Sequence, residues 1–223
     1  MIVKILRKRP TENEQYWEEF VYEGTPDISV AGMLDELNYK DDIVNAAGEI
    51  VPRIAWECSC LQGMCGGCAM VINGRPALAC ETFLRDLGKE VTLRPLSKFY
   101  VINDLVIDRG IIHENALKVN AYIEEYKTPP DSEYEHQYLA AKCLKCGLCL
   151  EICPNYVKGE RFYGALFAND CYLIATRSDV HNEEIKADYD KHFASGCSKS
   201  LSCVDVCPMK IPTMASMAKM NKK

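Results

Sequence analysis

The sequence has no long hydrophobic run. Cysteine aside, its longest uninterrupted stretch of apolar residues and glycine is at residues 162–168, whereas a membrane-spanning helix needs roughly 20 apolar residues. The first residues also lack the apolar segment and cleavage motif of a secretory signal peptide. We therefore expect a soluble chain in a reducing compartment, without a membrane span of its own.

Basic residues are also fewer than acidic ones. Lys and Arg number 26 against 32 Asp and Glu, which gives a net charge of −6. This balance argues against non-specific nucleic-acid binding, which needs a basic surface. The 13 glycines form no G-x-G-x-x-G or phosphate loop, so no nucleotide or flavin site is predicted. The histidines are scattered and form no Cys-x-His pair, which leaves a Rieske cluster unsupported; they are His113, His136, His181 and His192.

Cysteine, by contrast, is abundant, with 13 residues in a chain of 223. Disulfide scaffolds are usually shorter and denser in cysteine, so thiols at this level indicate metal or redox chemistry. The chain length favours two small domains. We place their boundary near Tyr100, giving a first domain over residues 1–100 and a second over residues 101–223. Residues 128–132, which contain two prolines, are expected to form a loop.

The first half predicts a small mixed sheet packed on one helix. Residues 2–6 and 19–22 are expected to pair as strands, and residues 69–72 and 75–79 as a hairpin about Asn73-Gly74. Residues 91–95 predict a further strand. An apolar stripe at Val30, Met33, Leu34 and Leu37 predicts a helix with Asp27 or Ser29 as its N-cap. A sheet of four or five strands would bury this stripe.

The first group of cysteines has the spacing C-x4-C-x2-C-x11-C, at Cys60, Cys65, Cys68 and Cys80. This is the plant-type pattern for a [2Fe–2S] cluster. A glycine-rich loop can wrap three thiolates around the cluster and point N–H groups at its sulfides, while the far strand of the hairpin supplies the fourth. Gly63, Gly66 and Gly67 fit this role. A structural zinc site is the alternative, although zinc sites favour C-x2-C pairs.

Cys58 does not fit the pattern, because using it as the first ligand would give C-x6-C. We expect it to be a buried thiol or one lying behind the ligands rather than a ligand itself.

The second half contains an internal repeat. Residues 143–154 read CLKCGLCLEICP and residues 197–208 read CSKSLSCVDVCP. Both follow C-x2-C-x2-C-x3-C-P, the run of two-cluster bacterial ferredoxins, in which the fourth cysteine ligates the other cluster. We expect a helix after each Cys-Pro to direct that fourth cysteine towards the other cluster. One set is then Cys143, Cys146, Cys149 and Cys207, a complete set for [4Fe–4S]. The other set is Cys153, Cys197 and Cys203.

The second run has Ser200 where its second cysteine would stand. Three thiolates suit a [3Fe–4S] cluster, which lacks one corner iron. Serine could ligate through its alkoxide, but the high pKa of its hydroxyl disfavours this. Cys171 has no partner in the scheme and is predicted to lie in the core.

This combination resembles the iron–sulfur subunit of the succinate dehydrogenase and fumarate reductase family over nearly the whole chain, including the stretch INGRPALAC and the two Cys-Pro endings. The resemblance implies an α+β fold, with an N-terminal β-grasp plant-type ferredoxin domain and an all-α domain of the two-cluster ferredoxin type. It implies ligands at all the cysteines assigned above and three clusters in series, [2Fe–2S], [4Fe–4S] and [3Fe–4S]. Electrons would pass between a FAD-containing flavoprotein subunit and quinone at membrane-anchor subunits, with this chain peripheral on the cytoplasmic side.

The chain also departs from the family. Succinate:ubiquinone enzymes resemble one another in having Trp where this chain has Lys158, and many have His where it has Ser198. Both tryptophans, Trp17 and Trp56, lie in the first domain. A menaquinone-linked fumarate reductase, as in anaerobic respiration, therefore fits better than a ubiquinone enzyme of the tricarboxylic acid cycle, and a relative with another electron donor stays open. Ligand spacing does not give the direction of reaction.

Two other classes stay open. One is the iron–sulfur subunit of a thiol-linked fumarate reductase or heterodisulfide-type oxidoreductase, although the C-C-G motif of the latter is missing. The other is a free ferredoxin-like carrier or a zinc-binding interaction protein. The C-terminal segment has Met214, Met217 and Met220 at spacing three, beside Lys219, Lys222 and Lys223. A packed terminal helix is expected there, with contact to a membrane subunit or anionic headgroups as the alternative.

Overall fold

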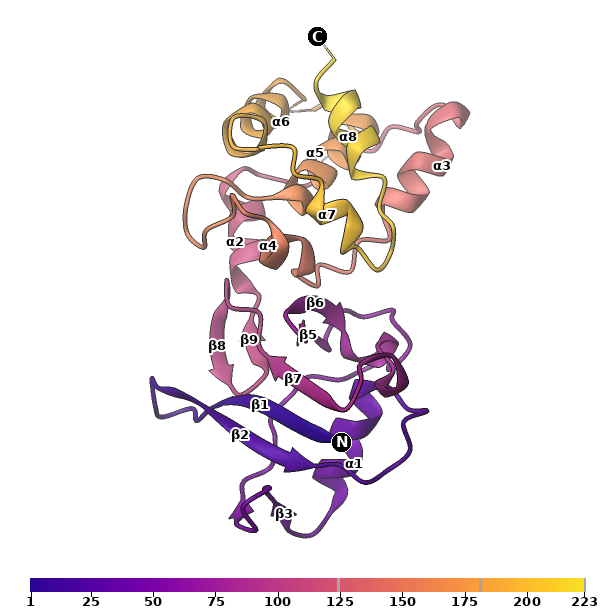
Figure 1. Ribbon diagram of the computed structural model, residues 1–223. Helices are drawn as coiled ribbons and strands as arrows, with labels where there is room; N and C mark the ends of the chain where they lie inside the picture. The colour runs from indigo at the N-terminus through magenta and orange to yellow at the C-terminus, as the bar shows by residue number, and fades with distance from the viewer. Residues whose placement is uncertain (124, 181, 223) are drawn as a thin grey trace. The chain divides into compact units, whose positions relative to one another are not determined.

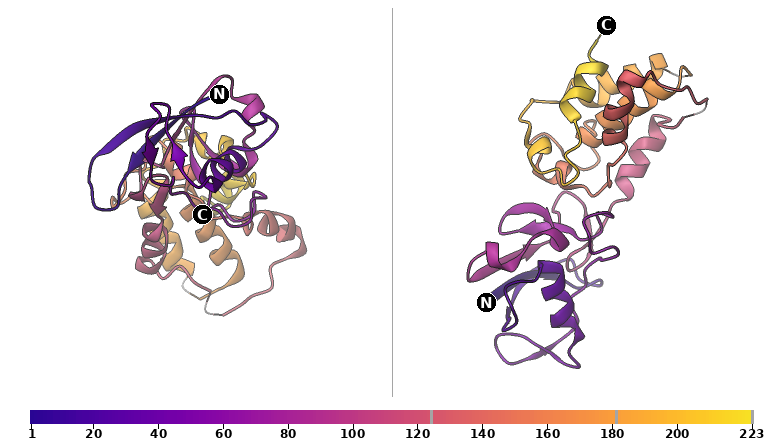
Figure 2. Two further views of the ribbon diagram at one scale, coloured as in Figure 1. Left: turned by 90° about the horizontal axis from the view of Figure 1, so that it is seen from below. Right: turned by 90° about the vertical axis from the view of Figure 1, so that its right-hand side faces the viewer.

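The computed structural model describes residues 1–123, 125–180 and 182–222, so His181 and Lys223 lie outside the described residues. The chain forms two compact units, Met1–Asp108 and Arg109–Lys223 (Figure 1, Figure 2). The division falls later than the expected boundary near Tyr100, because the hairpin of β8 (Tyr100–Asn103) and β9 (Val106–Asp108) belongs to the first unit. Among the described residues, no helix has the length and apolar character needed to cross a membrane.

A five-stranded sheet forms the frame of the first unit. It consists of β1 (Ile2–Lys8), β2 (Gln15–Val21), β5 (Ala69–Ile72), β6 (Arg75–Leu78) and β7 (Glu90–Arg94). The order is β2-β1-β7-β5-β6, with β1 and β7 parallel and the other pairs antiparallel. The predicted mixed sheet is thus confirmed.

Helix α1 (Val30–Tyr39) buries the predicted apolar stripe. Val30, Met33 and Leu34 are fully buried and Leu37 nearly so, which supplies the hydrophobic stabilisation of this unit. Of the two candidate caps, Ser29 is the one used, since its Oγ accepts a hydrogen bond from the Gly32 N–H at 3.1 Å.

The turn between β5 and β6 has the geometry that its sequence predicts. Asn73 and Gly74 have φ values of 47° and 79°, as a two-residue type I′ turn requires. The short pair β3 (Ile43–Val44) and β4 (Ile50–Val51) was not predicted. Strands of two residues are too short to show an alternating pattern.

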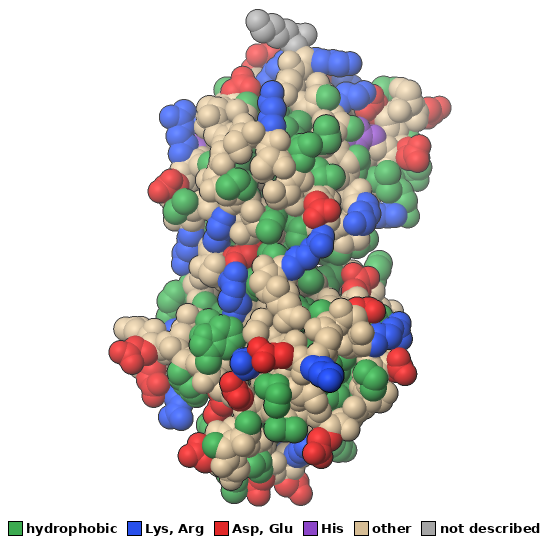
Figure 3. All heavy atoms as spheres, in the orientation of Figure 1, with side chains coloured by type: hydrophobic (Ala, Val, Ile, Leu, Met, Phe, Trp, Pro, Cys, Tyr) green, Lys and Arg blue, Asp and Glu red, His purple; other side chains and the backbone are tan. Residues whose placement is uncertain are grey.

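Among its described residues, the second unit contains helices joined by irregular segments and no strand. Its helices are α2 (Gly110–Lys118), α3 (Asp131–Ala140), α4 (Leu148–Ile152), α5 (Ala165–Arg177), α6 (Asn182–Tyr189), α7 (Ser202–Asp205) and α8 (Thr213–Met220), with a π-helical turn η3 (Asp190–Ala194) after α6. This confirms the predicted all-α second half. On the face drawn in Figure 3, acidic and basic side chains are interspersed on each unit.

The core of the second unit surrounds α5. Cys171 and Tyr172 are fully buried there and pack with Tyr189 and Phe193, so Cys171 lies in the core as predicted. The C-terminal segment forms a packed helix, also as predicted. Met220 is buried, although Met214 on the same helix is exposed.

Two expectations about the helices were wrong. Short helices precede each Cys-Pro pair instead of following it: α4 ends at Ile152 and α7 at Asp205. The reason is that a residue before proline disfavours helical geometry, and Cys153 is extended at φ −69° and ψ 122°. The loop expected over residues 128–132 ends early, because α3 begins at Asp131, where acidic side chains in the first turn favour a helix start.

Candidate metal centres

The first candidate centre is the loop before β5. Cys60, Cys65 and Cys68 lie in this irregular segment, and Cys80 lies in a 3₁₀ turn, η1 (Ala79–Glu81). We expected the far strand of the hairpin to carry the fourth cysteine. This was wrong, because β6 ends at Leu78 and Cys80 lies in the turn that follows it. The sulfurs of Cys68 and Cys80 are 3.3 Å apart, well beyond the roughly 2.05 Å of a disulfide. All thirteen cysteines are free.

Backbone N–H groups of this loop point at the cysteine sulfurs. The N–H groups of Gln62 and Met64 donate to Cys60 Sγ at 3.4 and 3.2 Å. Gly63 donates to Cys80 Sγ at 3.2 Å and Gly67 to Cys65 Sγ at 3.5 Å. These donors stabilise negative charge on sulfur, and those of Gln62 and Met64 lower the pKa of Cys60 to about 7. The loop is thus arranged to hold thiolates.

Two of the three predicted glycines are required by the backbone. Gly63 and Gly66 have φ values of 70° and 76°, a region that side chains disfavour. A Cβ on Gly63 would also lie 2.3 Å from Glu81 Oε1. Gly67 is less constrained, since its Cβ would meet Cys65 Sγ at an ordinary 3.7 Å.

Cys58 lies on the surface, which excludes the first of the two expectations, a buried thiol, and leaves the second, a thiol behind the ligands, as a prediction. The segment is anchored upstream of it. Ile54 is 2% exposed and its N–H donates to Asn38 Oδ1 at 2.9 Å, while the Ala55 N–H donates to Asp104 Oδ2 at 2.8 Å. Beyond these anchors the chain leaves the core before it reaches Cys58.

The second candidate centre brings together cysteines from both runs. Cys143, Cys146, Cys149 and Cys207 line one cavity, whose remaining walls include Leu148, Leu166 and Ile211. Burial raises the pKa of Cys146 to about 11 and raises those of Cys143 and Cys149 as well. In such an apolar site thiolates need a cationic partner. The donor set and the dry walls therefore fit an iron–sulfur cluster.

A separate cavity holds the other set. It is lined by Cys153, Cys197 and Cys203, together with the aromatic rings of Phe162 and Phe193. Ser200 lines the same cavity, and its Oγ accepts a hydrogen bond from Ser202 Oγ at 3.5 Å. Burial again raises the pKa of Cys203. The structure thus groups the cysteines as the crossed repeat predicts, with a serine on the wall of the smaller set.

The two runs are tied together beside this cavity. Asn155, which follows the first Cys-Pro, donates from Nδ2 to the carbonyl oxygen of Gly196 at 2.5 Å. Ser198 Oγ donates to Asn155 Oδ1 at 3.1 Å. The position that the family resemblance associates with histidine is therefore occupied here by a serine that bridges the two cysteine runs.

Other features of these centres were not predicted. Lys145, between Cys143 and Cys146, has a φ of 54°, and its ammonium bonds both carboxylate oxygens of Asp170. Tyr156 is buried with its hydroxyl unpaired among the described residues. A hydroxyl without a partner appears only in three dimensions, so no sequence signal could have identified it. No group of His, Cys, Asp or Glu side chains among the described residues converges tightly enough for a single metal ion.

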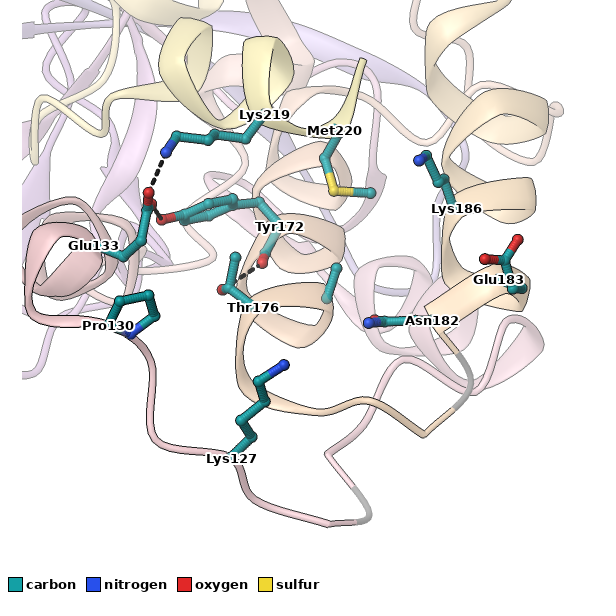
Figure 4. Close-up of a pocket in the computed structure, with 11 residues that line it drawn as sticks. Lys127, Pro130, Glu133, Tyr172, Thr176, Asn182, Glu183, Lys186, Lys219 and Met220 are labelled. Atoms are coloured by element: carbon teal, nitrogen blue, oxygen red, sulfur yellow. Dashed lines mark hydrogen bonds and ion pairs between the residues drawn. The ribbon is translucent and has the colours of Figure 1, made fainter. Parts of the chain in front are cut away.

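A wider hollow of about 460 Å³ lies between α3, α5, α6 and α8, away from the thiols (Figure 4). Two of its lysines are paired, Lys219 with Glu133 and Lys127 with Asp179. Tyr172 donates its hydroxyl to Glu133 at 3.1 Å. Asn182 also lines the hollow, and its Oδ1 has no hydrogen-bond partner among the described residues. The lining contains no cysteine, so the hollow offers no ligand set comparable with those of the cysteine sites.

Two protein-family models match this chain, one in each half. Residues 2–114 match a 2Fe-2S iron-sulfur cluster binding domain, and residues 139–211 match a 4Fe-4S dicluster domain. The first match contains the glycine-rich loop and Cys80, and the second contains both Cys-Pro runs.

Related proteins are similar over nearly the full chain. The succinate dehydrogenase iron-sulfur subunit of Bacillus subtilis is 31% identical, over 98% of this chain and 90% of the relative. The fumarate reductase iron-sulfur subunit of Wolinella succinogenes is 29% identical, over 95% of this chain and 90% of the relative. Among solved structures, a chain of the Mycobacterium smegmatis Sdh1 complex in the apo form has the same fold, with a TM-score of 0.74 and 23% identity, over 98% of this chain and 94% of that one.

Proposed function

Since the chain belongs to the family of succinate dehydrogenase and fumarate reductase iron–sulfur subunits, we propose that it carries single electrons between a FAD-containing flavoprotein subunit and a quinone site at membrane-anchor subunits. Membership confirms the resemblance drawn from the cysteine runs. As an electron-transfer subunit of such an oxidoreductase, the chain carries no substrate site in this proposal.

The observation that supports the ligand sets best is the crossing of the two runs. Cys207 of the second run lines the cavity of Cys143, Cys146 and Cys149, and Cys153 of the first run lines that of Cys197 and Cys203. We assign the first cavity to the [4Fe–4S] cluster and the second to the [3Fe–4S] cluster. Cys60, Cys65, Cys68 and Cys80 are assigned to the [2Fe–2S] cluster.

When bound, such clusters accept and release one electron at a time without bond rearrangement in the protein. The protein's part is to hold the thiolates and tune their surroundings. Loop N–H groups stabilise charge on Cys60 and Cys80. In the second unit, leucine and phenylalanine side chains line the cavities beside the thiols, and a low local dielectric strengthens electrostatic interactions.

Ser200 supports the assignment of the three-iron type. It lines the cavity at the place where the first run has Cys146, and its hydroxyl is a weak ligand because it is normally protonated. The cavity therefore provides thiolates for three irons and none for a fourth.

The electron acceptor or donor at the membrane end is proposed to be menaquinone. Lys158 and Ser198 stand where ubiquinone enzymes of the family resemble one another in having tryptophan and histidine. A low-potential quinone suits fumarate reduction in anaerobic respiration, which we favour over succinate oxidation in the tricarboxylic acid cycle. The chain is proposed to be peripheral, held by anchor subunits at the cytoplasmic side of the membrane.

The proposal is tested by assembling the chain with and without its flavoprotein partner. The chain alone should reduce no fumarate with an artificial donor, and activity should appear when the flavoprotein is added. Robust turnover by the flavin-free chain would contradict the assignment.

The first ligand set has its own test. Cys65→Ala should remove the [2Fe–2S] signal in electron paramagnetic resonance and leave the other two clusters, because that loop belongs to a separate unit. Cys58→Ser, which changes an exposed thiol of the same segment, is the matched control and should leave all signals. If Cys58→Ser removed the signal and Cys60→Ser did not, the register of the ligands would be wrong.

A further inference from the structure

One asparagine side chain joins the two cysteine runs beside the three-thiol cavity. Asn155 lies two residues after Cys153, and its Nδ2 donates to the carbonyl oxygen of Gly196. Its Oδ1 accepts a hydrogen bond from Ser198 Oγ at 3.1 Å. Gly196 and Ser198 are the two chain neighbours of Cys197. A single amide therefore holds the chain on both sides of one cysteine of the set, and it is itself attached close to another.

The link from Asn155 back to Cys153 is short and stiff. Only Pro154 stands between them, and the proline ring fixes its own backbone φ at about −65°. Proline also restricts the residue before it, and Cys153 is extended, as this restriction requires. Because few backbone rotations remain free in this link, the position of Asn155 determines where the backbone of Cys153 lies.

The chain before Cys197 is anchored to the wall of the same cavity. The N–H groups of Gly196 and Cys197 both donate to the carbonyl oxygen of Phe193 at 3.0 Å. A Cβ on Gly196 would lie 2.7 Å from Phe162 Cδ2, so glycine is what lets the backbone approach this ring. Phe162 and Phe193 both line the three-thiol cavity. The carbonyl group that Asn155 binds is therefore held in a fixed place.

The repeat has apolar residues at the equivalent positions of the four-thiol cavity. Asn155 corresponds to Met209, and Ser198 corresponds to Leu144. Both Met209 and Leu144 line the four-thiol cavity, where their side chains can pack but have no hydrogen to donate. The polar pair of Asn155 and Ser198 is therefore a property of the three-thiol set and not of the repeat.

We propose that Asn155 is a positioning residue for the three-iron cluster, whose amide sets the separation of Cys153 and Cys197 so that both thiolates meet the irons. The inference rests on the proposed ligand set of Cys153, Cys197 and Cys203. A cluster held by three thiolates loses a larger share of its ligands when one is misplaced than a cluster held by four. Groups that orient metal ligands typically contribute roughly 10–100-fold to metal affinity.

Asn155→Ala removes both hydrogen bonds and tests the inference. The cluster-loaded full chain is exposed to an iron chelator, and electron paramagnetic resonance follows each cluster over time. We expect the three-iron signal to decay roughly tenfold faster than in the wild type, at the lower end of that range. The signals of the other two clusters should decay at wild-type rates, because the two hydrogen bonds hold only the chain around Cys153 and Cys197.

The line shape of the three-iron signal provides a second readout. Thiolates that are less constrained give a wider range of cluster geometries, so the signal of Asn155→Ala should be broader than that of the wild type before any iron is lost. A general loss of folding stability would reduce the amount of signal without broadening it.

Two milder variants separate the two hydrogen bonds. Asn155→Asp keeps an acceptor for Ser198 but removes the donor to Gly196. Ser198→Ala removes only the bond to Asn155 Oδ1. Each variant should speed the loss of the three-iron cluster, and each should do so less than Asn155→Ala.

Ser195→Ala is the matched control. Ser195 directly precedes Gly196, but its Oγ donates to the carbonyl oxygen of Lys191 at 3.0 Å, within its own turn of chain. This variant removes one hydrogen bond from the same stretch and leaves the link between the runs intact. All three signals should therefore decay at wild-type rates.

The outcomes separate this inference from the proposed function. A wild-type chain without a three-iron cluster would contradict the ligand set itself. A wild type with that cluster, together with an Asn155→Ala variant of unchanged decay and unchanged line shape, would overturn only the role of Asn155. If Asn155→Ala does not fold, Asn155→Asp carries the same test. Equal loss of both clusters of the second unit in Asn155→Asp would also overturn the inference, because Asn155 would then support the fold and not one ligand set.

Discussion

Arg7 and Asp104 form a buried ion pair in the first unit. Their Nε and Oδ1 atoms are 2.9 Å apart, and each side chain is 3% exposed. Arg7 also pairs with Glu18 at 2.6 Å. Asp104 accepts hydrogen bonds from the backbone N–H groups of Lys8 at 3.0 Å and Ala55 at 2.8 Å. This one carboxylate therefore joins β1, the segment leading to the cluster loop and the β8–β9 hairpin.

Replacing this carboxylate should destabilise the first unit strongly. Asp104→Ala leaves Arg7 with one carboxylate instead of two and removes the acceptor of the buried Lys8 N–H and the partly buried Ala55 N–H. Removing one partner of a buried pair typically costs about 3–5 kcal/mol. Denaturant unfolding followed by the visible absorbance of the [2Fe–2S] cluster would measure the loss. Asp27→Asn is the control: the Arg85–Asp27 pair is exposed, and such pairs contribute at most about 1 kcal/mol. Equal effects of the two variants would contradict the central role of Asp104.

His136 should make the second unit sensitive to acid. Burial lowers its pKa, as does the charge of Lys219, while the charge of Glu133 opposes the shift. The ring stacks on Tyr172 with centroids 4.2 Å apart. Its pKa in the unfolded chain is about 6.5, so on acidification the unfolded chain takes up the proton first. The stabilising contribution is thus complete above about pH 6.5 and is lost as pH falls through the lower pKa of the folded form.

His136→Gln should flatten this part of the stability profile. The measurement is the free energy of unfolding of the full chain between about pH 5 and pH 8, compared with the wild type. His113→Gln, which changes an exposed histidine of α2, should keep the wild-type slope. An identical slope for wild type and His136→Gln would show that His136 does not couple to folding.

Lys145 and Asp170 should behave as a coupled pair. Both oxygens of Asp170 bond the Lys145 ammonium, and burial otherwise raises the pKa of this carboxylate. Lys145→Met should therefore destabilise the second unit, and adding Asp170→Asn should restore part of the loss. A double-mutant cycle is expected to give a coupling of about 0.5–3 kcal/mol. Lys142→Met is the control, because the Lys142 ammonium lies over the Tyr138 ring, 4.3 Å from its centre, and so should not couple to Asp170→Asn. Additive effects of the two changes would contradict the coupling.

Ser200→Cys should convert the third cluster. The new thiolate completes the C-x2-C-x2-C-x3-C-P run and lets one further iron bind, which lowers the reduction potential through added negative charge. Each fall of about 59 mV reduces the one-electron equilibrium constant tenfold, so exchange with quinone should slow while dye-linked activity on the flavin side persists. Iron analysis and low-temperature electron paramagnetic resonance would check this. Ser202→Cys, at a neighbouring position of the run where the pattern has no cysteine, should leave iron content unchanged; a gain of iron there as well would show that Ser200 does not mark the vacant corner.

The sequence predicted the first unit well where the pattern is local. The stripe of α1 and the Asn73-Gly74 turn follow from periodicity and turn chemistry, and both are confirmed. The position of Cys80 could not be predicted to the residue, because the end of a strand depends on its pairing partner rather than on its own composition. The exposure of Cys58 could not be predicted for a similar reason, since it is set by the anchors at Ile54 and Ala55.

For the second unit, spacing alone predicted which cysteines share a cavity, because the repeat implies the exchange of the last ligand. The local backbone geometry around the two runs was harder to predict. The helices before Cys153 and Cys207 could have been inferred from the following proline, which ends a helix at or before the preceding residue. The environment of Tyr156 could not be predicted from the sequence. Whether its hydroxyl finds a hydrogen-bond acceptor depends on how α4, the loop after it and α5 pack together.

The exchanged cysteines also set an order of events during biosynthesis. On the proposed ligand sets, neither cavity of the second unit is complete without residues of both runs, and the last of these is Cys207. A nascent chain stalled before the second run would offer the iron-delivery machinery three thiols of one set and one thiol of the other, so neither set would be complete. Loading of both centres is therefore expected to follow translation of the second run, whereas the glycine-rich loop of the first unit can receive its iron while the ribosome is still synthesising the remainder.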